Sequence, residues 1–105
     1  MKIEWLMAAE DDLRESARWV AVNFGGDTAE RVVKDVVDET ARLSEFPKIG
    51  RLCNEYRGAR REYRALHTRH DRIVYTITAS CVLIVAVFDT RRNPDDLARL
   101  LHERE

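Results

Sequence analysis

Apolar residues repeat at a helical spacing in the first half of the chain and at a strand spacing in the second half. The chain opens with a predicted strand from Lys2 to Leu6, because apolar and charged residues alternate there. A helix follows, with acidic residues in its first turn, where the helix dipole favours negative charge. The acids are Glu10, Asp11 and Asp12, and the apolar face consists of Leu13, Ala17, Val20, Ala21 and Phe24. The pair Gly25-Gly26 ends this helix.

A second helix is predicted to begin at Asp27, a good N-cap residue with Glu30 three positions later. Pro47 and Gly50 end it. Its inner face consists of Ala29, Val32, Val33, Val36, Val37, Thr40 and Leu43. Two helices joined by so short a break must pack as an antiparallel hairpin, and their apolar faces need a sheet to cover.

The second half of the chain supplies that sheet. Residues Arg61 to His67 alternate weakly, and Arg72 to Ser80 alternate more strongly. The inner side of this second strand consists of Ile73, Tyr75, Ile77 and Ala79. Val82 to Phe88 is apolar throughout, which is typical of a strand that is buried on both faces in the interior of a sheet.

A short helix closes the chain. Asn93 is the predicted N-cap, Pro94 takes the first helical position, and Asp95 and Asp96 follow in the first turn. Its apolar stripe of Leu97, Leu100 and Leu101 indicates packing. The order of elements predicts one α+β domain over residues 1–105. Its expected core is Trp5, Leu13, Val33, Val36, Leu43, Ile73, Tyr75, Ile77, Ile84, Val85 and Val87.

Composition excludes several classes of protein. The chain has 105 residues, of which 45% are hydrophobic and 35% charged, so a disordered segment is excluded. No apolar run is long enough to span a bilayer and the first residues do not resemble a signal peptide, so we expect a cytoplasmic protein without membrane contact. Cys53 and Cys81 lack metal-ligand spacing, so both are expected to be reduced and structural, with no metal or organic cofactor.

Charge is distributed unevenly along the chain. Residues 1–46 contain 6 Lys/Arg and 11 Asp/Glu, whereas residues 47–105 contain 12 Lys/Arg and 8 Asp/Glu. The excess of basic residues in the second half indicates either a face for a polyanion or an acidic partner, or arginines that solvate an exposed sheet.

Several short motifs occur in a specific order: IEWLMAAEDDL followed by Trp19, then DTAERV, FPKIGR, GARREYRAL, DRIVYTI and VLIVAVFDTRRNP. Together, over nearly the whole chain, they resemble the RelE/ParE superfamily. The resemblance implies a helical hairpin on a small twisted antiparallel sheet with a short C-terminal helix. It also implies a toxin of a bacterial type II toxin–antitoxin system that arrests growth and is neutralised by a cognate antitoxin. Operon DNA would be contacted only through that antitoxin.

One branch of the superfamily cleaves mRNA in the ribosome. Such cleavage needs a base, cations that stabilise the phosphate, and an acid. The resemblance matches Arg72, and Arg91 or Arg92, to the arginines of these nucleases, and Arg72 and Arg92 are the expected catalytic pair that stabilises the phosphate. Their terminal tyrosine is missing here, which leaves His67 as the best candidate for the base, with His70 and Glu62 as weaker ones. A loop histidine such as His70 is more often a solvated turn residue.

The other branch inhibits DNA gyrase without hydrolytic chemistry, and the resemblance favours it. The FPKIGR break, the GARRE start of a strand and the RRNP ending are closer to this ParE-like branch. Arg91, Arg92, Arg61 and Arg64 are then the expected target-binding residues, because docking needs a charged, complementary surface and no proton relay. A third alternative stays open, a toxin-fold protein that only binds its antitoxin and regulates their operon.

Overall fold

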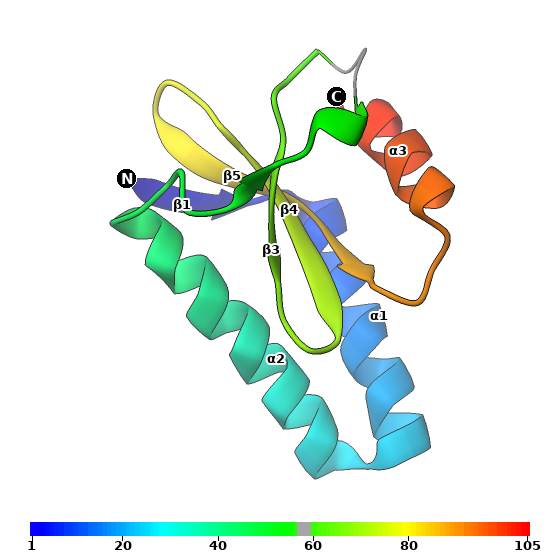
Figure 1. Ribbon diagram of the computed structural model, residues 1–105. Coiled ribbons are helices and arrows are strands. Elements are labelled where there is room, and N and C mark those ends of the chain that lie inside the picture. The colour runs from blue at the N-terminus through cyan, green and yellow to red at the C-terminus, as the bar shows by residue number, and fades with distance from the viewer. Residues whose placement is uncertain (57–59) are drawn as a thin grey trace.

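Three α-helices and a five-stranded sheet form the part of the chain that the computed structural model describes, residues 1–56 and 60–105. The elements are β1 (Lys2–Trp5), α1 (Met7–Phe24), α2 (Gly26–Ala41), the 3-10 turn η1 (Arg42–Ser44), β2 (Arg51–Leu52), the 3-10 turn η2 (Asn54–Tyr56), β3 (Arg64–His67), β4 (Asp71–Ile77), β5 (Cys81–Asp89) and α3 (Pro94–Glu103). The predicted order of one strand, two helices, a set of strands and a final helix is confirmed (Figure 1).

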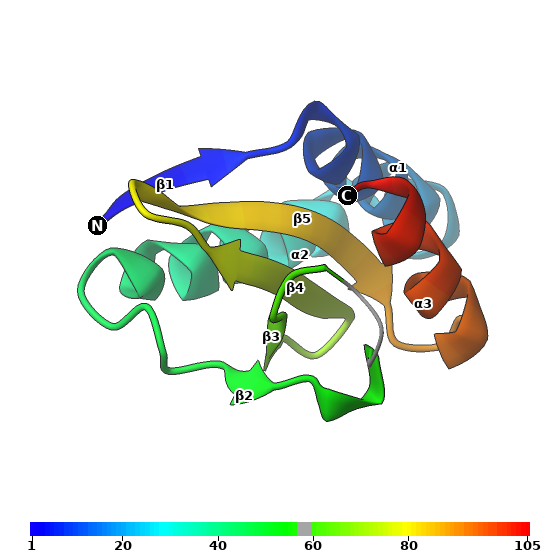
Figure 2. The same cartoon turned by 90° about the horizontal axis from the view of Figure 1, so that it is seen from above.

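The sheet is mixed, with the strand order β1-β5-β4-β3-β2 (Figure 2). Strands β2 to β5 pair antiparallel, whereas β1 runs parallel to β5 with Lys2 opposite Cys81. The α+β class is therefore confirmed, and the antiparallel expectation holds for every strand except β1. Short loops force β3, β4 and β5 to be antiparallel, but no short loop fixes the direction of β1. The two-residue strand β2 was not predicted.

The helical hairpin turns at Gly25, whose φ of 95° lies in the left-handed region that favours glycine. Because α2 begins at Gly26, the predicted N-cap at Asp27 is wrong; Gly25 is the N-cap, and no side chain caps this end. Asp27 lies in the first turn, where its charge still favours the helix dipole. Helix α1 likewise begins early, at Met7, so that Glu10 is the acidic residue of its first turn and Asp12 lies further along the helix.

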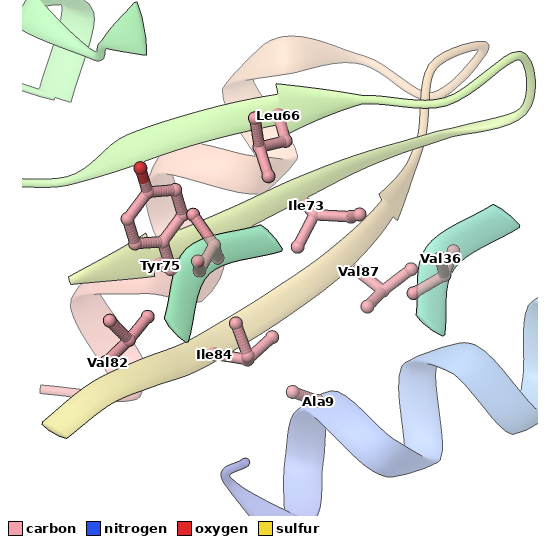
Figure 3. Close-up of a cluster of buried hydrophobic side chains, with 9 residues drawn as sticks. Ala9, Val36, Leu66, Ile73, Tyr75, Val82, Ile84 and Val87 are labelled. Carbon is pink, nitrogen blue, oxygen red and sulfur yellow. The ribbon is translucent and has the colours of Figure 1, made fainter. Parts of the chain in front are cut away.

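The hairpin and α3 cover opposite faces of the sheet (Figure 1). Side chains of β4 and β5 alternate between two clusters, so that Ile73 packs with the hairpin and Val74 with α3. Figure 3 shows the cluster under the hairpin. The predicted core residues Val36, Leu43, Ile73, Tyr75, Ile84, Val85 and Val87 are buried, whereas Trp5, Leu13, Val33 and Ile77 are only half-buried at its margin.

The predicted apolar face of α1 is wrong at its C-terminal end. Ala21 is exposed, and Phe24 is 62% exposed. This end of α1 extends past the strands together with the hairpin turn, so that no sheet lies opposite (Figure 1). The helical spacing predicted a continuous buried stripe because it carries no information about where the sheet ends.

Two predicted strands are shorter than expected. Strand β4 ends at Ile77 and not at Ser80, because the Thr78 hydroxyl accepts hydrogen bonds from the backbone N–H groups of Ser80 and Cys81 and forms a turn. Ala79 is accordingly exposed. Strand β3 begins at Arg64 and not at Arg61, which lies exposed before the strand. The Gly58-Ala59 start of the GARREYRAL motif lies outside the described residues.

Helix α3 begins as predicted. The Asn93 side chain accepts a hydrogen bond from Asp95 N at 3.0 Å, and Pro94 occupies the first helical position. Leu97 and Leu101 are buried against the sheet. The apolar stripe therefore packs in the core, as expected.

A β-bulge in β5 changes the sheet edge beyond the end of β1. Val74 pairs with Ala86 and Tyr75 pairs with Ile84, which leaves Val85 as the extra residue. The Arg104 guanidinium donates to Val85 O at 2.8 Å, and the Asp12 carboxylate accepts from Val87 N at 3.1 Å. These two side chains also form a bidentate ion pair with N–O distances of 2.7 and 2.9 Å. The Asp12–Arg104 ion pair thus binds the backbone groups of Val85 and Val87 that have no neighbouring strand to pair with.

Among the described residues, no helix combines the length and the apolar character that crossing a membrane requires.

Candidate functional site

Arg91 is fixed by the turn that follows β5. The Asp89 carboxylate accepts hydrogen bonds from the backbone N of Arg91 at 2.9 Å, from its Nε at 3.2 Å and from its Nη2 at 2.9 Å. An aspartate that binds the backbone two residues ahead is a common turn device. Here the same carboxylate also orients the side chain. The Arg91 side chain nevertheless remains 53% exposed.

The end of α1 that extends past the sheet lies opposite Arg91. The Arg91 guanidinium lies over the Trp19 ring, with its central carbon 4.1 Å from the ring centroid. Trp19 also contacts the Phe24 ring, at a centroid distance of 5.7 Å, and is itself 42% exposed. We call Trp19, Phe24, His70 and Arg91 the Trp19–Arg91 surface. Its two largest aromatic side chains are solvent-accessible because the sheet ends before them.

His70 connects Arg91 to the interior. Its Nε2 lies 3.3 Å from Arg91 Nη2, and its Nδ1 lies 3.1 Å from Asp71 Oδ1. The arrangement assigns the neutral tautomer in which Nδ1–H donates to Asp71 and Nε2 accepts from Arg91. The His70 side chain is 18% exposed, so the expectation of a solvated turn residue is wrong. The ring is covered because α1 packs across the loop between β3 and β4.

Asp71 is buried at the start of β4, with 0% relative exposure. The Ser16 hydroxyl of α1 donates to its carboxylate at 3.1 Å, and the Thr68 hydroxyl accepts from Asp71 N at 3.0 Å. Burial raises the pKa of Asp71, while the contacts from His70 and Ser16 oppose that rise. The hydrogen bond from Arg91 has the opposite effect on the pKa of Asp89 and lowers it. The two carboxylates beside His70 therefore titrate in different ranges.

Ser16, His70 and Asp71 do not form a nucleophilic triad. The Ser16 hydroxyl and the Asp71 carboxylate both contact His70 Nδ1, at 3.2 and 3.1 Å. A triad needs the acid and the nucleophile on different nitrogens of the ring, so that a proton can pass through it. The other nitrogen, Nε2, faces the Arg91 guanidinium. The arrangement holds side chains in place and activates no hydroxyl group.

Open grooves flank Arg91 on both sides. One has a volume of about 640 Å³ and lies between the hairpin and the β3–β4 loop, with Val20, Phe24 and Val32 among its lining residues. The other has a volume of about 510 Å³ and extends along α1, with Trp19 and Arg92 among its lining residues. Arg91 lines both grooves. The Trp19–Arg91 pair therefore forms a ridge between two concave areas.

Arg92 lies on the α3 side of the same turn. Its guanidinium lies over the Phe88 ring at 4.6 Å, and Phe88 is directly opposite Arg72 on the neighbouring strand. The structure thus brings the two predicted catalytic arginines close to one residue: Arg92 lies over the Phe88 ring, and Arg72 is the cross-strand neighbour of Phe88.

Arg72 and His67 also meet, as cross-strand neighbours in β4 and β3. Arg72 Nε donates to His67 Nε2 at 3.1 Å, and Arg72 Nη1 donates to the Tyr56 hydroxyl at 3.1 Å. Partial burial, together with the charges of Arg72 and Arg51, lowers the pKa of His67. A His67 whose Nε2 lone pair already accepts a hydrogen bond is poorly prepared to take a proton from substrate through that nitrogen. Glu62 lies at the far end of the β3–β4 hairpin, in a groove with Arg61 and Thr78.

The predicted target-binding arginines fall into two groups. Arg91 and Arg92 lie just after β5, close to the start of β4, whereas Arg61 and Arg64 lie near its end. The Arg64 guanidinium donates to Gly50 O at 2.9 Å and to Lys48 O at 3.3 Å, so that it fixes the chain before β2. The single basic face expected from the sequence is therefore divided between two ends of the sheet.

The role of the buried network was not predicted from the sequence. In the sequence, Trp19 and Asp71 stand out only as members of the family motifs, and Ser16 belongs to none of them. One local signal exists, since Ser16 and Trp19 lie three residues apart and therefore on one face of α1. This face of α1 continues beyond the end of the sheet, so an aromatic residue there cannot pack in the core and needs another side chain to contact.

Comparisons with known proteins agree with this fold. The sequence model of the ParE toxins of the type II toxin–antitoxin system parDE matches residues 3–94. One of the solved structures that match is the chromosomal ParDE toxin–antitoxin system from P. aeruginosa, with a TM-score of 0.72. The alignment has 18% sequence identity and covers 85% of this chain and 95% of that chain, so this likeness concerns the fold alone. No curated protein matches the chain.

Proposed function

Because the chain belongs to the ParE toxin family of type II toxin–antitoxin systems, we propose that it arrests growth by inhibiting DNA gyrase. In this proposal the toxin docks on gyrase through the Trp19–Arg91 surface and Arg92, and it carries out no hydrolytic step. Membership of the family also implies a cognate antitoxin that neutralises the toxin.

One observation carries the choice of docking surface: Arg91 is ordered by several contacts and yet more than half exposed. Asp89, His70 and the Trp19 ring all hold its guanidinium. Arginine and tryptophan are enriched among the residues that contribute most to protein–protein affinity, because they present a large contact area. A side chain that is already ordered loses little conformational entropy on binding. This combination supports a role in recognition.

Arg92 extends the proposed surface towards α3. It is exposed, and the Phe88 ring supports its guanidinium as the Trp19 ring supports that of Arg91. Two neighbouring arginines on aromatic supports, with a groove on either side of the Arg91 ridge, offer shape and charge to an acidic partner surface.

The geometry near Arg72 favours docking over mRNA cleavage. The cations of a nuclease site are present, but the nitrogen His67 Nε2 is occupied by Arg72. Partial burial of the ring and the charge of Arg72 also disfavour the protonated histidine, so His67 is a weak acid catalyst as well. Cleavage of mRNA on the ribosome remains the competing function that the experiment must exclude.

A second surface fits the antitoxin. A groove of about 410 Å³ runs between α1 and α2, with Leu13, Ala17, Val33 and Val37 among its lining residues. Val37 is 50% exposed, although it belongs to the apolar side of α2. We propose that an antitoxin segment covers this groove, which lies on the hairpin. Hydrogen exchange of the toxin with and without its antitoxin tests this, and slower exchange in α1 and α2 is the expected result.

The test of target and surface uses the full-length toxin, purified from its complex with the antitoxin. We expect wild-type toxin to inhibit plasmid supercoiling by gyrase, and Arg91→Ala and Arg92→Ala each to weaken inhibition by about tenfold or more. Arg99→Ala is the matched control, since Arg99 is an exposed arginine on α3 whose partner, Asp96, belongs to the same helix. It should inhibit like wild type.

The same preparation is added to programmed ribosomes carrying mRNA. Cleaved mRNA together with undisturbed supercoiling would overturn the gyrase proposal and establish the nuclease function. Equal weakening by Arg91→Ala and Arg99→Ala would leave gyrase as the target but refute the docking surface. If the protein neither inhibits gyrase nor cleaves mRNA, and its expression does not arrest growth, the result would support the third alternative, a protein that only binds its antitoxin and regulates their operon.

A further inference from the structure

We propose that His70 is a positioning residue, which holds Arg91 in the orientation that the target recognises. The role assigned to the target rests on the proposed function, whereas the positioning of Arg91 does not depend on it. His70 itself need not touch the target, because its ring is mostly covered, with 18% of the side chain exposed.

The hydrogen bonds at the His70 ring have a fixed direction. Asp71 is buried and accepts hydrogen bonds, so it orients Nδ1–H of His70 towards itself. A neutral imidazole with its proton on Nδ1 has an acceptor at Nε2. Arg91 Nη2 lies 3.3 Å from that acceptor. Asp71 therefore fixes the tautomer of His70, so that the Arg91 guanidinium faces the lone pair of Nε2 and not an N–H group.

Contacts from three parts of the chain keep the His70 ring in place. Ser16 Oγ donates to Asp71 and lies 3.2 Å from His70 Nδ1. The carbonyl of His70 accepts from the backbone N and the hydroxyl of Thr90, both at 3.2 Å, which joins the loop to the end of β5. Contacts from α1, from β4 and from the turn after β5 thus meet at one residue. The same contacts place Trp19, which is three residues after Ser16, and Arg91, which follows Thr90.

Without His70, the Arg91 guanidinium is held less firmly. Asp89 alone contacts Nε and Nη2 of the guanidinium and is also near His70 Nε2, at 3.8 Å. With one carboxylate as its only polar partner, the guanidinium can rotate away from the Trp19 ring, since the side chain is exposed. Asp89 holds one edge of the guanidinium, and the contact with His70 Nε2 adds a third hydrogen bond from a different residue, which limits rotation of the guanidinium plane about that edge.

Two substitutions separate positioning from simple structural support. In His70→Asn the amide group replaces Nδ1, so the contact with Asp71 is kept and the contact with Arg91 is lost. In His70→Gln the amide reaches the position of Nε2, so the contact with Arg91 is restored. If His70 positions Arg91, we expect Asn to weaken gyrase inhibition by about tenfold and Gln to recover most of that loss.

A double-mutant cycle supplies the readout that a structural role would not change. On an Arg91→Ala background, His70→Asn should cause no further loss of inhibition, because the side chain through which it acts is absent. Additive losses, or a larger loss for Gln than for Asn, would overturn the proposal. If His70→Asn is unstable, His70→Ala takes its place in the cycle, since it also removes the contact with Arg91.

A measurement without gyrase keeps the two proposals apart. In nitrogen-15 NMR relaxation of the toxin, the Nε–H group of Arg91 should be ordered in wild type and in His70→Gln and mobile in His70→Asn. The same order in all three variants would refute positioning. The expected NMR pattern in a toxin that does not inhibit gyrase would uphold positioning and refute the proposed target.

Discussion

Two arginine–carboxylate sites join the end of β5 to its surroundings, and they differ in what they leave exposed. Arg104 and Asp12 form a bidentate pair in which the side chains are 16% and 15% exposed. Arg91 and Asp89 form a similar pair, but their side chains are 53% and 21% exposed. Similar chemistry thus completes the interior at one site and presents a charge to solvent at the other.

The difference follows from the backbone beside each pair. At the first site the bulge and the end of β1 leave Val85 O and Val87 N without a strand partner, and both atoms are bound by the ion pair. Polar backbone atoms in such a position need partners. At the second site the turn after β5 is already closed by Asp89, so the Arg91 guanidinium is not needed to satisfy it. Its planar group remains accessible to another molecule.

The largest effect is expected at the first pair. Arg104→Met leaves the Asp12 carboxylate and Val85 O without their partner, so the free energy of unfolding should fall by about 3 kcal/mol. Urea denaturation followed by circular dichroism measures it, with Arg99→Met as the control on an exposed arginine. Adding Asp12→Asn should recover part of the loss, because the uncompensated charge is removed. A loss no greater than that of the control would show that the pair is not structural.

Fold prediction from the sequence succeeded where the signal is local. Asn93, Pro94 and Asp95 identify the start of α3 within three consecutive residues. The apolar run of β5 likewise identifies an interior strand without any knowledge of its neighbours. Cap residues and apolar runs act over one or two turns of chain, so a single sequence contains the whole signal.

The site was predictable only as a set of arginines. Asp12 and Arg104 are 92 positions apart and Ser16 and His70 are 54 apart, so no spacing in the sequence connects them. His70 has the sequence context of a solvated loop residue, and it is covered because α1 packs across the loop. Whether an arginine is structural, as Arg64 is, or exposed on an aromatic support, as Arg91 is, depends on such long-range packing.

The two carboxylates beside His70 should make opposite contributions to the pH dependence of the free energy of unfolding. Burial raises the pKa of Asp71 from its ordinary 3.8, so its contribution to stability is complete below 3.8 and is lost as pH rises through the folded value. The Arg91 hydrogen bond lowers the pKa of Asp89, so its contribution is present above 3.8 and is lost as pH falls. Relative to wild type, Asp71→Asn should therefore gain stability as pH rises above 3.8. Asp89→Asn should lose stability relative to wild type as pH rises towards 3.8 from below, and the difference should stay constant above 3.8.

Urea denaturation at a series of pH values measures both differences, and carbon-13 NMR of the carboxyl groups measures the titrations directly. If the free energies of unfolding of the two variants, relative to wild type, changed with pH in the same way, the assignment of one buried and one arginine-bound carboxylate would be wrong. Such a result would also weaken the contrast between the interior and the exposed end of the His70 network.

A smaller effect is expected at Asn93, which lies between the two arginine sites. Asn93→Ala removes the hydrogen bond accepted from Asp95 N and should lower the free energy of unfolding by about 1 kcal/mol. Gyrase inhibition should be unchanged, because the turn that holds Arg91 is closed by Asp89. Restoration of stability by Asn93→Ser would identify capping as the cause. A loss of inhibition in the alanine variant would instead show that α3 and the Arg91 turn are coupled.

The smallest change in stability is expected when the first substitution is repeated at the second pair. Arg91→Met leaves Asp89 partly exposed, where water can solvate its carboxylate, and no backbone atom loses a partner to the guanidinium. The urea midpoint should therefore stay close to that of wild type, while the affinity for gyrase falls. Arg104→Met should show the reverse in any variant that remains folded, with reduced stability and near-normal affinity. If both substitutions reduced stability equally, the exposed pair would also be structural, and the argument that Arg91 is kept for recognition would fail.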